Sequence, residues 1–230
     1  DKVISRIEAN TPNGLFGINI GPNKETKNRI EDYLIGVRKF YNLADYLTIN
    51  ISSPNTENLR SFHNKNELNE LLGKIENEKK ILKTNINIVV KISPDIDDQD
   101  VNKISELLIK YNVSAVIISN STDGNRENLK NINKLEKGGL SGKPLEVKSN
   151  LLINKFFKIL GSRIKIIGAG GVDSGKSAYE KIINGASLVQ LYTGMVYQGP
   201  NIVSKISNEL IEITKNYGVK NISELVGIKK

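Results

Sequence analysis

Short apolar runs alternate along the chain with segments whose apolar residues recur every three to four positions. Six runs are rich in Ile, Val and Leu and have the length of buried strands. They cover residues 15–20, 44–51, 86–92, 114–119, 164–167 and 188–192. The run at 86–92 is almost continuously apolar, which is typical of a parallel strand covered on both faces.

The segments between these runs have the periodicity of amphipathic helices. Leu68, Leu71 and Ile75, for example, share one face of a helix. Helices are predicted around residues 30–37, 67–82, 97–111, 145–160, 174–184 and 202–213. Gly161 can end the fourth of these helices, and Ser174 can cap the start of the fifth.

A strand–helix unit that repeats six times predicts a parallel sheet with helices outside it. A doubly wound sheet places a glycine-rich loop after its first strand, and no such loop follows the run at 15–20. A (β/α)8 barrel places its phosphate site after its last two strands, where the glycine-rich run 168–171 stands. The sequence therefore predicts an incomplete TIM barrel, with six C-terminal βα units in one domain over residues 1–230 and without the first two strands.

Composition narrows the possible chemistry. The 230 residues include no Cys and one His, His63, so disulfides, thiolate catalysis and a metal site are not expected. No apolar run is long enough to span a membrane. The formal charge of +8 comes from lysines scattered among acidic residues rather than from an Arg-rich stripe, so nucleic-acid binding is not expected. We expect His63 to be a surface or lid residue rather than a catalytic one.

Polar residues stand at the ends of the predicted strands, where barrel enzymes hold their catalytic groups. In chain order these are Asn19, residues 50–56, Lys91, residues 119–122, residues 168–171 and residues 192–193. Amides and hydroxyls both donate and accept hydrogen bonds, which suits a flat, polar, conjugated ligand. Lys91 ends an apolar strand, where an ion pair with a barrel carboxylate is the alternative to a ligand contact.

Three loops on this face are rich in glycine. They cover residues 138–145, 168–171 and 192–194. Small residues let backbone N–H groups approach a phosphate closely. One such loop is equally consistent with a tight turn, whereas three together suggest a phosphorylated cofactor.

The motif Asn-Ile-Ser-Ser-Pro-Asn-Thr at 50–56, followed by Leu59 and Arg60, resembles the catalytic loop of class 2 dihydroorotate dehydrogenases. These are FMN enzymes of pyrimidine synthesis. The resemblance continues in order through residues 44–46, 90–92, 119–122, 139–145, 168–175 and 185–193. Class 1 relatives and dihydropyrimidine dehydrogenases carry Cys where Ser53 stands here, which favours class 2.

The resemblance implies the oxidation of (S)-dihydroorotate to orotate in de novo UMP biosynthesis, with quinone as the electron acceptor. Ser53 would be the general base for the C5 proton, Thr56 would help a water to relay that proton, and the C6 hydride would pass to flavin N5. The implied substrate residues are Asn50, Asn55, Asn120 and Ser121. The implied FMN residues are Asn19, Asn50, Lys91, Ser119, Gly142, Gly171, Tyr192 and Thr193.

The chain departs from the family pattern at two positions, since Ser121 stands where Thr is usual and Pro22 where Lys is usual. Relatives also carry an Asn-Arg-x-Gly-Phe-Asn segment and a membrane-docking helical pair upstream of the part that matches. The class implies a peripheral enzyme, on the cytoplasmic side of a bacterial inner membrane or on the mitochondrial inner membrane, with membrane contact through a segment outside these residues.

Two alternative functions remain. One is a different FMN- or phosphate-binding barrel enzyme, such as an isomerase or synthase, and the other is a non-catalytic phosphate-binding module.

Overall fold

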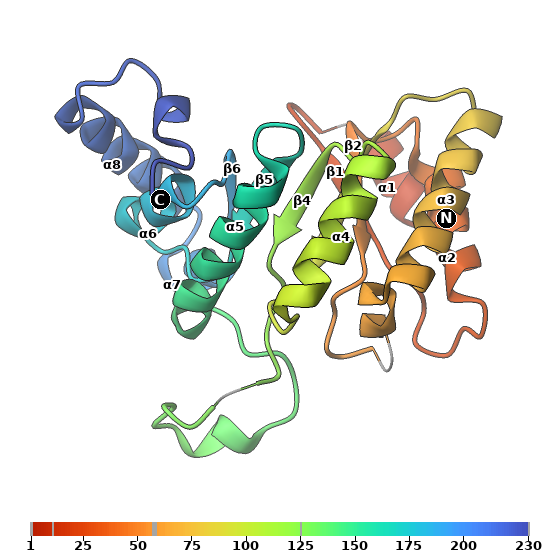
Figure 1. Cartoon of the computed structure of the whole chain (residues 1–230), viewed down its shortest axis with the longest axis horizontal. Coiled ribbons are helices and arrows are strands. Elements are labelled where there is room, and N and C mark those ends of the chain that lie inside the picture. Colours follow the sequence, from red (N-terminus) through yellow and green to blue (C-terminus); the bar gives the residue numbers. More distant parts are fainter. Residues whose placement is uncertain (1, 11, 57–58, 125, 230) are drawn as a thin grey trace.

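The computed structural model describes residues 2–10, 12–56, 59–124 and 126–229. The chain progresses across the molecule from α2 and α3 at one end to α6 and α8 at the other (Figure 1). The strands are β1 (Gly17–Ile20), β2 (Tyr46–Asn50), β3 (Asn87–Ile92), β4 (Ala115–Ile118), β5 (Lys165–Ala169) and β6 (Leu188–Gln190).

These strands form one sheet in strict sequence order, from β1 to β6, in the described part of the chain. Every neighbouring pair is parallel. A doubly wound sheet would reverse the strand order at its switch point. Here the strand order does not reverse. Because connections between parallel strands are right-handed, all the connecting helices then lie on the same side of the sheet. The prediction of an incomplete TIM barrel is therefore confirmed.

Each strand is followed by a helix that lies close to its predicted position. The helices are α2 (Arg29–Phe40), α3 (Lys65–Ile81), α4 (Asp98–Lys110), α5 (Glu146–Leu160), α6 (Gly175–Ile183) and α8 (Ile202–Asn216). The sequence did not predict the shorter elements. These are α1 (Lys2–Ala9), α7 (Thr193–Gln198) and the 3-10 turns η1 (Leu59–His63), η2 (Ile132–Leu135), η3 (Lys143–Leu145) and η4 (Ile222–Leu225).

Alternation along the strands gives the sheet two different faces. On β3, Ile88, Val90 and Ile92 belong to the main core beneath the helices. Val89 belongs instead to a small apolar cluster with residues of β4 and β5 on the inner face. Lys91 has the same parity as Val89, so the pleat turns it toward the inside of the barrel.

The ends of the elements show where sequence reasoning was right and where it was wrong. Ser174 caps α6 by accepting the backbone N–H three residues later, and Gly161 ends α5 with a φ of 56°, both as predicted. The first strand was placed too early, since Leu15 is 90% exposed. The last strand ends at Gln190 rather than at residue 192, because the chain turns there into α7.

A buried lysine connects α6 to α5 and to the end of β5. Lys181 is fully buried, and its ammonium donates to Ser149 Oγ at 3.2 Å and to Asn150 Oδ1 at 3.0 Å. Ser149 Oγ donates in turn to the carbonyl oxygen of Ala169 at 2.6 Å. Burial lowers the pKa of Lys181 to about 8.

We predict that this lysine makes folding depend on pH in the alkaline range. Between the folded pKa of about 8 and the ordinary value of 10.5, the unfolded chain binds more protons than the folded chain. The free energy of unfolding therefore rises with pH across this window, by on the order of 3 kcal/mol. Denaturant unfolding of the wild type and of Lys181→Met should show this rise only in the wild type. Lys176→Met, at an exposed position of the same helix, is the control and should behave as the wild type.

Candidate functional site

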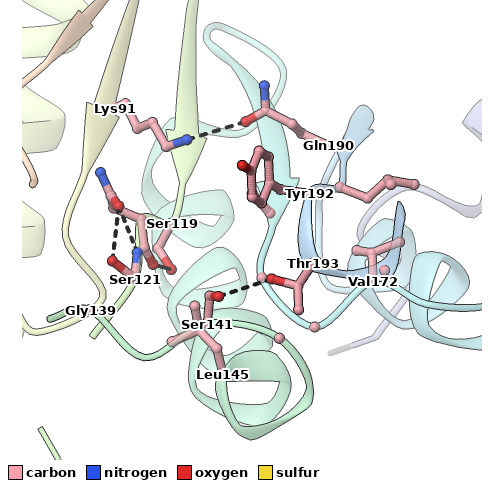
Figure 2. A pocket seen from close by; sticks show the side chains of 17 residues that line it. Lys91, Ser119, Ser121, Gly139, Ser141, Leu145, Val172, Gln190, Tyr192 and Thr193 are labelled. Carbon is pink, nitrogen blue, oxygen red and sulfur yellow. Dashed lines mark hydrogen bonds between the residues drawn. The ribbon is translucent and has the colours of Figure 1, made fainter. Parts of the chain in front are cut away.

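The carboxyl ends of the strands meet at one end of the sheet, and two adjoining pockets open there in the described residues. The first pocket, of about 430 Å³, lies between the ends of β3 to β6 and the glycine-rich loops (Figure 2). The second pocket, of about 340 Å³, lies over the inner face of β1 to β3 beside the serine loop, residues 50–56. Lys91, Asn120 and Gln190 line both pockets, so the two form one continuous site.

Lys91 is the cation of this site. Its ammonium lies 3.5 Å from Gln190 Oε1, an uncharged partner from β6 (Figure 2). Burial lowers the pKa of Lys91. Among the described residues no carboxylate pairs with it, so the ion pair considered from the sequence is not formed. The positive charge of Lys91 therefore remains available to an anionic or electron-rich ligand.

A hydrogen-bonded group of amides and hydroxyls joins the end of β2 to the end of β4. Asn50 Oδ1 accepts from Ser52 Oγ at 2.9 Å and from Asn120 Nδ2 at 3.2 Å. Asn120 Nδ2 also donates to Ser52 Oγ at 2.9 Å, and Asn120 Oδ1 accepts the backbone N–H of Ser121 at 2.7 Å. The Asn120 amide is thus fixed in one orientation, because its oxygen and its nitrogen have different partners, while Asn50 is held through its Oδ1.

Ser53 lines the second pocket together with Asn50 and Lys91. It is half-buried, and its Oγ accepts the backbone N–H of Asn55 at 3.3 Å. This bond uses a lone pair of the hydroxyl and leaves its proton free to turn into the pocket. Asn55 and Thr56 follow on the same loop and line neither pocket.

The glycine-rich loops form the far wall of the first pocket. Gly170 and Gly171 have φ angles of +100° and +80°, a region that favours glycine. A Cβ on Gly171 would lie 2.5 Å from a side-chain carbon of α5. Gly142 also has a positive φ, and beside it Ser141 Oγ and Thr193 Oγ1 are hydrogen-bonded at 2.9 Å. Backbone and hydroxyl donors are therefore brought together where a phosphate would need them.

Arg60 joins the serine loop to the loop that follows β4. Its guanidinium donates to the carbonyl oxygens of Ser52 at 3.3 Å and Ser121 at 3.2 Å. The same group pairs with Asp123 at 2.6 Å and with Asp95 at 3.1 Å. The planar, five-donor guanidinium can serve all four acceptors at once, which the ammonium of lysine could not do.

Asp95 extends this network to α5. Although burial works in the opposite direction, hydrogen bonds from Lys148 and Thr122 lower the pKa of Asp95 to about 2. Asp95 is therefore ionised at neutral pH, and it gives Arg60 a permanent counter-charge.

Tyr33 supports the end of β2 from the helix layer. Its hydroxyl donates to the carbonyl oxygen of Asn50 at 2.7 Å, and its ring packs edge-on against Phe62 at 5.7 Å between centroids. The side chain is fully buried, which raises the pKa of Tyr33. The position of Asn50 is thus fixed from α2 as well as from β4.

Most of the residues predicted from the sequence gather at this site. The first pocket contains Lys91, Ser119, Asn120, Ser121, Gly142, Gly171, Tyr192 and Thr193, and the second adds Asn19, Asn50 and Ser53. Tyr192 is 81% exposed and so stands at the mouth of the site. Sequence reasoning missed Gln190 and Arg60, although alternation along residues 188–192 and the position of Arg60 after the serine loop were signals for them. The surface position expected for His63 is wrong, because the side chain is only 5% exposed.

The sequence of this chain matches one family along almost its whole length. Residues 1–214 match the model of the family described as dihydroorotate dehydrogenase.

The chain belongs to the dihydroorotate dehydrogenase family.

Similar curated proteins are named dihydroorotate dehydrogenase (quinone), which places the chain in class 2 of the family. The protein from Bartonella tribocorum is 41% identical over 216 residues, which are 92% of this chain and 60% of that protein. The protein from Nitrosomonas europaea is 42% identical over 225 residues, which are 95% of this chain and 66% of that protein. The chain thus spans less than two thirds of the length of these relatives.

Solved dihydroorotate dehydrogenase structures from Eimeria tenella agree with the fold. The complex with ferulenol superposes with a TM-score of 0.90 at 31% identity, over 97% of this chain and 64% of that one. The ligand-free form gives the same TM-score over 99% of this chain and 68% of that one. The six-stranded sheet of the described residues is therefore part of a dihydroorotate dehydrogenase barrel.

We predict that Arg60→Lys loosens the serine loop without unfolding the barrel. Lysine keeps a positive charge near Asp95 and Asp123 but cannot also hold the carbonyls of Ser52 and Ser121. Hydrogen exchange in peptides that cover residues 50–56 and 119–124 should accelerate roughly tenfold, since local opening would cost about 1.4 kcal/mol less.

The control for this experiment is Lys148→Gln, which removes an ion pair of Asp95 and leaves the two carbonyl contacts of Arg60 in place. Equal protection of the serine loop in Arg60→Lys and wild type would show that the carbonyl contacts do not hold it.

Proposed function

We propose that this chain is the catalytic barrel of an FMN-dependent dihydroorotate dehydrogenase that oxidises (S)-dihydroorotate to orotate in UMP biosynthesis. Membership of the family supports this proposal. The observation that carries it is the meeting of Ser53, Asn120 and Lys91 in one pocket at the strand ends. A base, an amide for a planar polar ring and an uncompensated cation are the groups that this reaction needs.

The first pocket fits a flavin mononucleotide. Its volume of about 430 Å³ falls in the range usual for small-molecule sites. A cation without a carboxylate partner lies at one side of it, and glycines at positive φ lie at the other. The residues proposed to hold FMN are Asn19, Asn50, Lys91, Ser119, Gly142, Gly171, Tyr192 and Thr193. When bound, FMN supplies the acceptor for the hydride that leaves C6 of the substrate.

Lys91 and the glycine-rich loops have different parts in this binding. The ammonium of Lys91 lies by the strand ends, where it stabilises negative charge on the ring system. Gly171 and Thr193 lie across the pocket, where backbone and hydroxyl groups donate to a phosphate. The two ends of the cofactor are thus assigned to chemically different walls.

The substrate is proposed to bind over the serine loop. Asn50, Asn120 and Ser121 are held ready by their mutual hydrogen bonds, so little side-chain entropy is lost when they meet the ring and carboxylate of the substrate. Asn55 is the fourth proposed substrate residue. It lies outside the lining of both pockets, so its contact requires the loop to close over the substrate.

Ser53 is the proposed general base, which takes the proton from C5 of dihydroorotate. A serine hydroxyl is a weak base unless its own proton can move onward as it accepts the new one. Thr56, three residues later on the same loop, is proposed to hold the water that receives this proton. The proton thus leaves through the serine loop while the hydride leaves from the neighbouring carbon.

Quinone is the proposed electron acceptor, in keeping with the names of the relatives. In the described ranges of the chain, no helix has the length and apolar character needed to cross a bilayer. We propose peripheral attachment, through a segment outside this chain, to the cytoplasmic side of a bacterial inner membrane or to the mitochondrial inner membrane.

Ser53→Ala should slow the proton transfer and leave the cofactor site intact. We expect flavin reduction by dihydroorotate to slow by roughly 10²–10⁴ at neutral pH, the range typical of a lost general base. Ser53→Cys should recover part of the rate at alkaline pH, where the thiolate forms. Stopped-flow absorbance of the flavin measures both rates, and wild-type reduction by Ser53→Ala would refute the assignment.

Lys91→Ala and Gly171→Val should act on the cofactor instead. Lys91→Ala removes the only proposed cation of the ring site, and Gly171→Val introduces a Cβ that collides with α5 at a φ where valine is strained. FMN affinity should fall roughly tenfold or more in each, about 1.4 kcal/mol. Lys165→Ala, at the exposed opposite end of the sheet, is the control and should keep full FMN content. Unchanged affinity in both site variants would contradict the placement of the cofactor.

A further inference from the structure

The single histidine of the chain is buried between the serine loop and the end of β3. His63 Nδ1 lies 2.8 Å from the carbonyl oxygen of Arg60, and Nε2 lies 3.1 Å from the backbone nitrogen of Ser93. A carbonyl oxygen can only accept a hydrogen bond and a backbone N–H can only donate one. Nδ1 must therefore carry the ring proton while Nε2 is bare, so the surroundings select one neutral tautomer of His63.

The peptide group that His63 holds also contacts the site. The N–H of Ser93 belongs to the same peptide plane as the carbonyl of Ile92, and that carbonyl accepts the backbone N–H of Asn120 at 3.0 Å. One rigid peptide plane thus connects His63 to Asn120. On the other side of the ring, Arg60 donates to the carbonyl oxygen of Ser52 in the serine loop.

The charges near the ring come from several elements. Burial is the main influence and lowers the pKa of His63. The hydrogen bond to the Arg60 carbonyl and the carboxylate of Asp100 in α4 raise this pKa, whereas the positive charge of the Arg60 guanidinium lowers it further. Two further acids of adjoining segments are already engaged, since Glu67 of α3 accepts from Ser61 and Asp95 pairs with Arg60.

We propose that His63 is a positioning residue, which as a neutral ring holds the Ile92–Ser93 peptide, and through it Asn120, in alignment with the serine loop. Protonation places an N–H at Nε2 directly against the N–H of Ser93 and breaks their hydrogen bond. The Asn120 backbone then loses its fixed support. The effect on turnover rests on the proposed function, in which Asn120 binds the substrate. The coupling between His63 and Asn120 does not depend on the proposed function.

Two substitutions separate the hydrogen bonds of His63 from its bulk. His63→Gln can offer an amide oxygen to Ser93 and an amide N–H to the Arg60 carbonyl, and it does not titrate. His63→Leu fills the space with neither bond. The first test below does not use the leucine variant, so the proposal remains testable even if that variant unfolds.

The first test is spectroscopic and uses the FMN-bound protein labelled with 15N-histidine for the ring and with 15N-serine for the Ser93 amide. The His63 signal is identified as the one that His63→Gln lacks. We expect the Nδ1–H tautomer at neutral pH, a ring pKa below the ordinary value of about 6.5, and a backbone amide signal of Ser93 that shifts with the same midpoint. The Nε2–H tautomer, a ring pKa at or above that value, or a Ser93 signal that ignores the ring would overturn the proposal.

The second test is the pH dependence of KM for dihydroorotate. In the wild type KM should rise severalfold as the pH falls below about 6.5 toward the lowered ring pKa, with a smaller change in kcat. His63→Gln should abolish this rise, and His63→Leu should have the raised KM at every pH. Identical pH profiles of KM in wild type and His63→Gln would refute the coupling. If the first test gives the expected spectra but the protein does not oxidise dihydroorotate, only the proposed function is refuted.

Discussion

Parallel hydrogen bonding between consecutive strands, with no reversal of their order, is the constraint on which this structure depends. It aligns the carboxyl ends of the strands at one end of the sheet. Residues far apart in sequence, such as Asn50, Lys91 and Asn120, therefore become neighbours without any long connection between them. The same order leaves the helices on a single side and reserves the inner face for the site.

The polar groups on that face are kept in place by a second layer of contacts. Tyr33 reaches Asn50 from α2, and Arg60 reaches two carbonyls from η1. Lys181 acts from α6 on the end of β5 through Ser149. Each of these side chains belongs to a helix or helical turn. Tyr33 and Arg60 donate directly to backbone carbonyls, and Lys181 donates to a hydroxyl that is itself bound to one. The helix layer thus determines the geometry of loops that are themselves mostly polar and would otherwise be mobile.

The sequence predicted the strand order and most of the site because both depend on local patterns. Alternating apolar runs and strand-end amides are visible within a few residues, and so are the glycine-rich loops, in which Gly142, Gly170 and Gly171 have positive φ. His63 could not be placed in this way, since its burial depends on Ser93, which lies 30 positions away. Gln190 was missed although alternation pointed to it, because β6 is short and the strand was predicted to continue to residue 192, next to the start of α7. The roles of Asn55 and Thr56 were assigned by resemblance, and their position outside the pocket lining depends on a loop conformation that no local pattern specifies.

The partly buried charge of Lys91 links the folding of this protein to the supply of its ligand. Burial destabilises the ammonium, and in the described residues its partner is only a neutral amide. An anionic or electron-rich ligand that neutralises this charge recovers the electrostatic free energy that folding alone leaves unfavourable. Such a ligand binds the native chain and not the unfolded one, so it shifts the folding equilibrium by mass action. In a cell, the concentration of such a ligand would then influence how much of the newly made chain survives in its folded form.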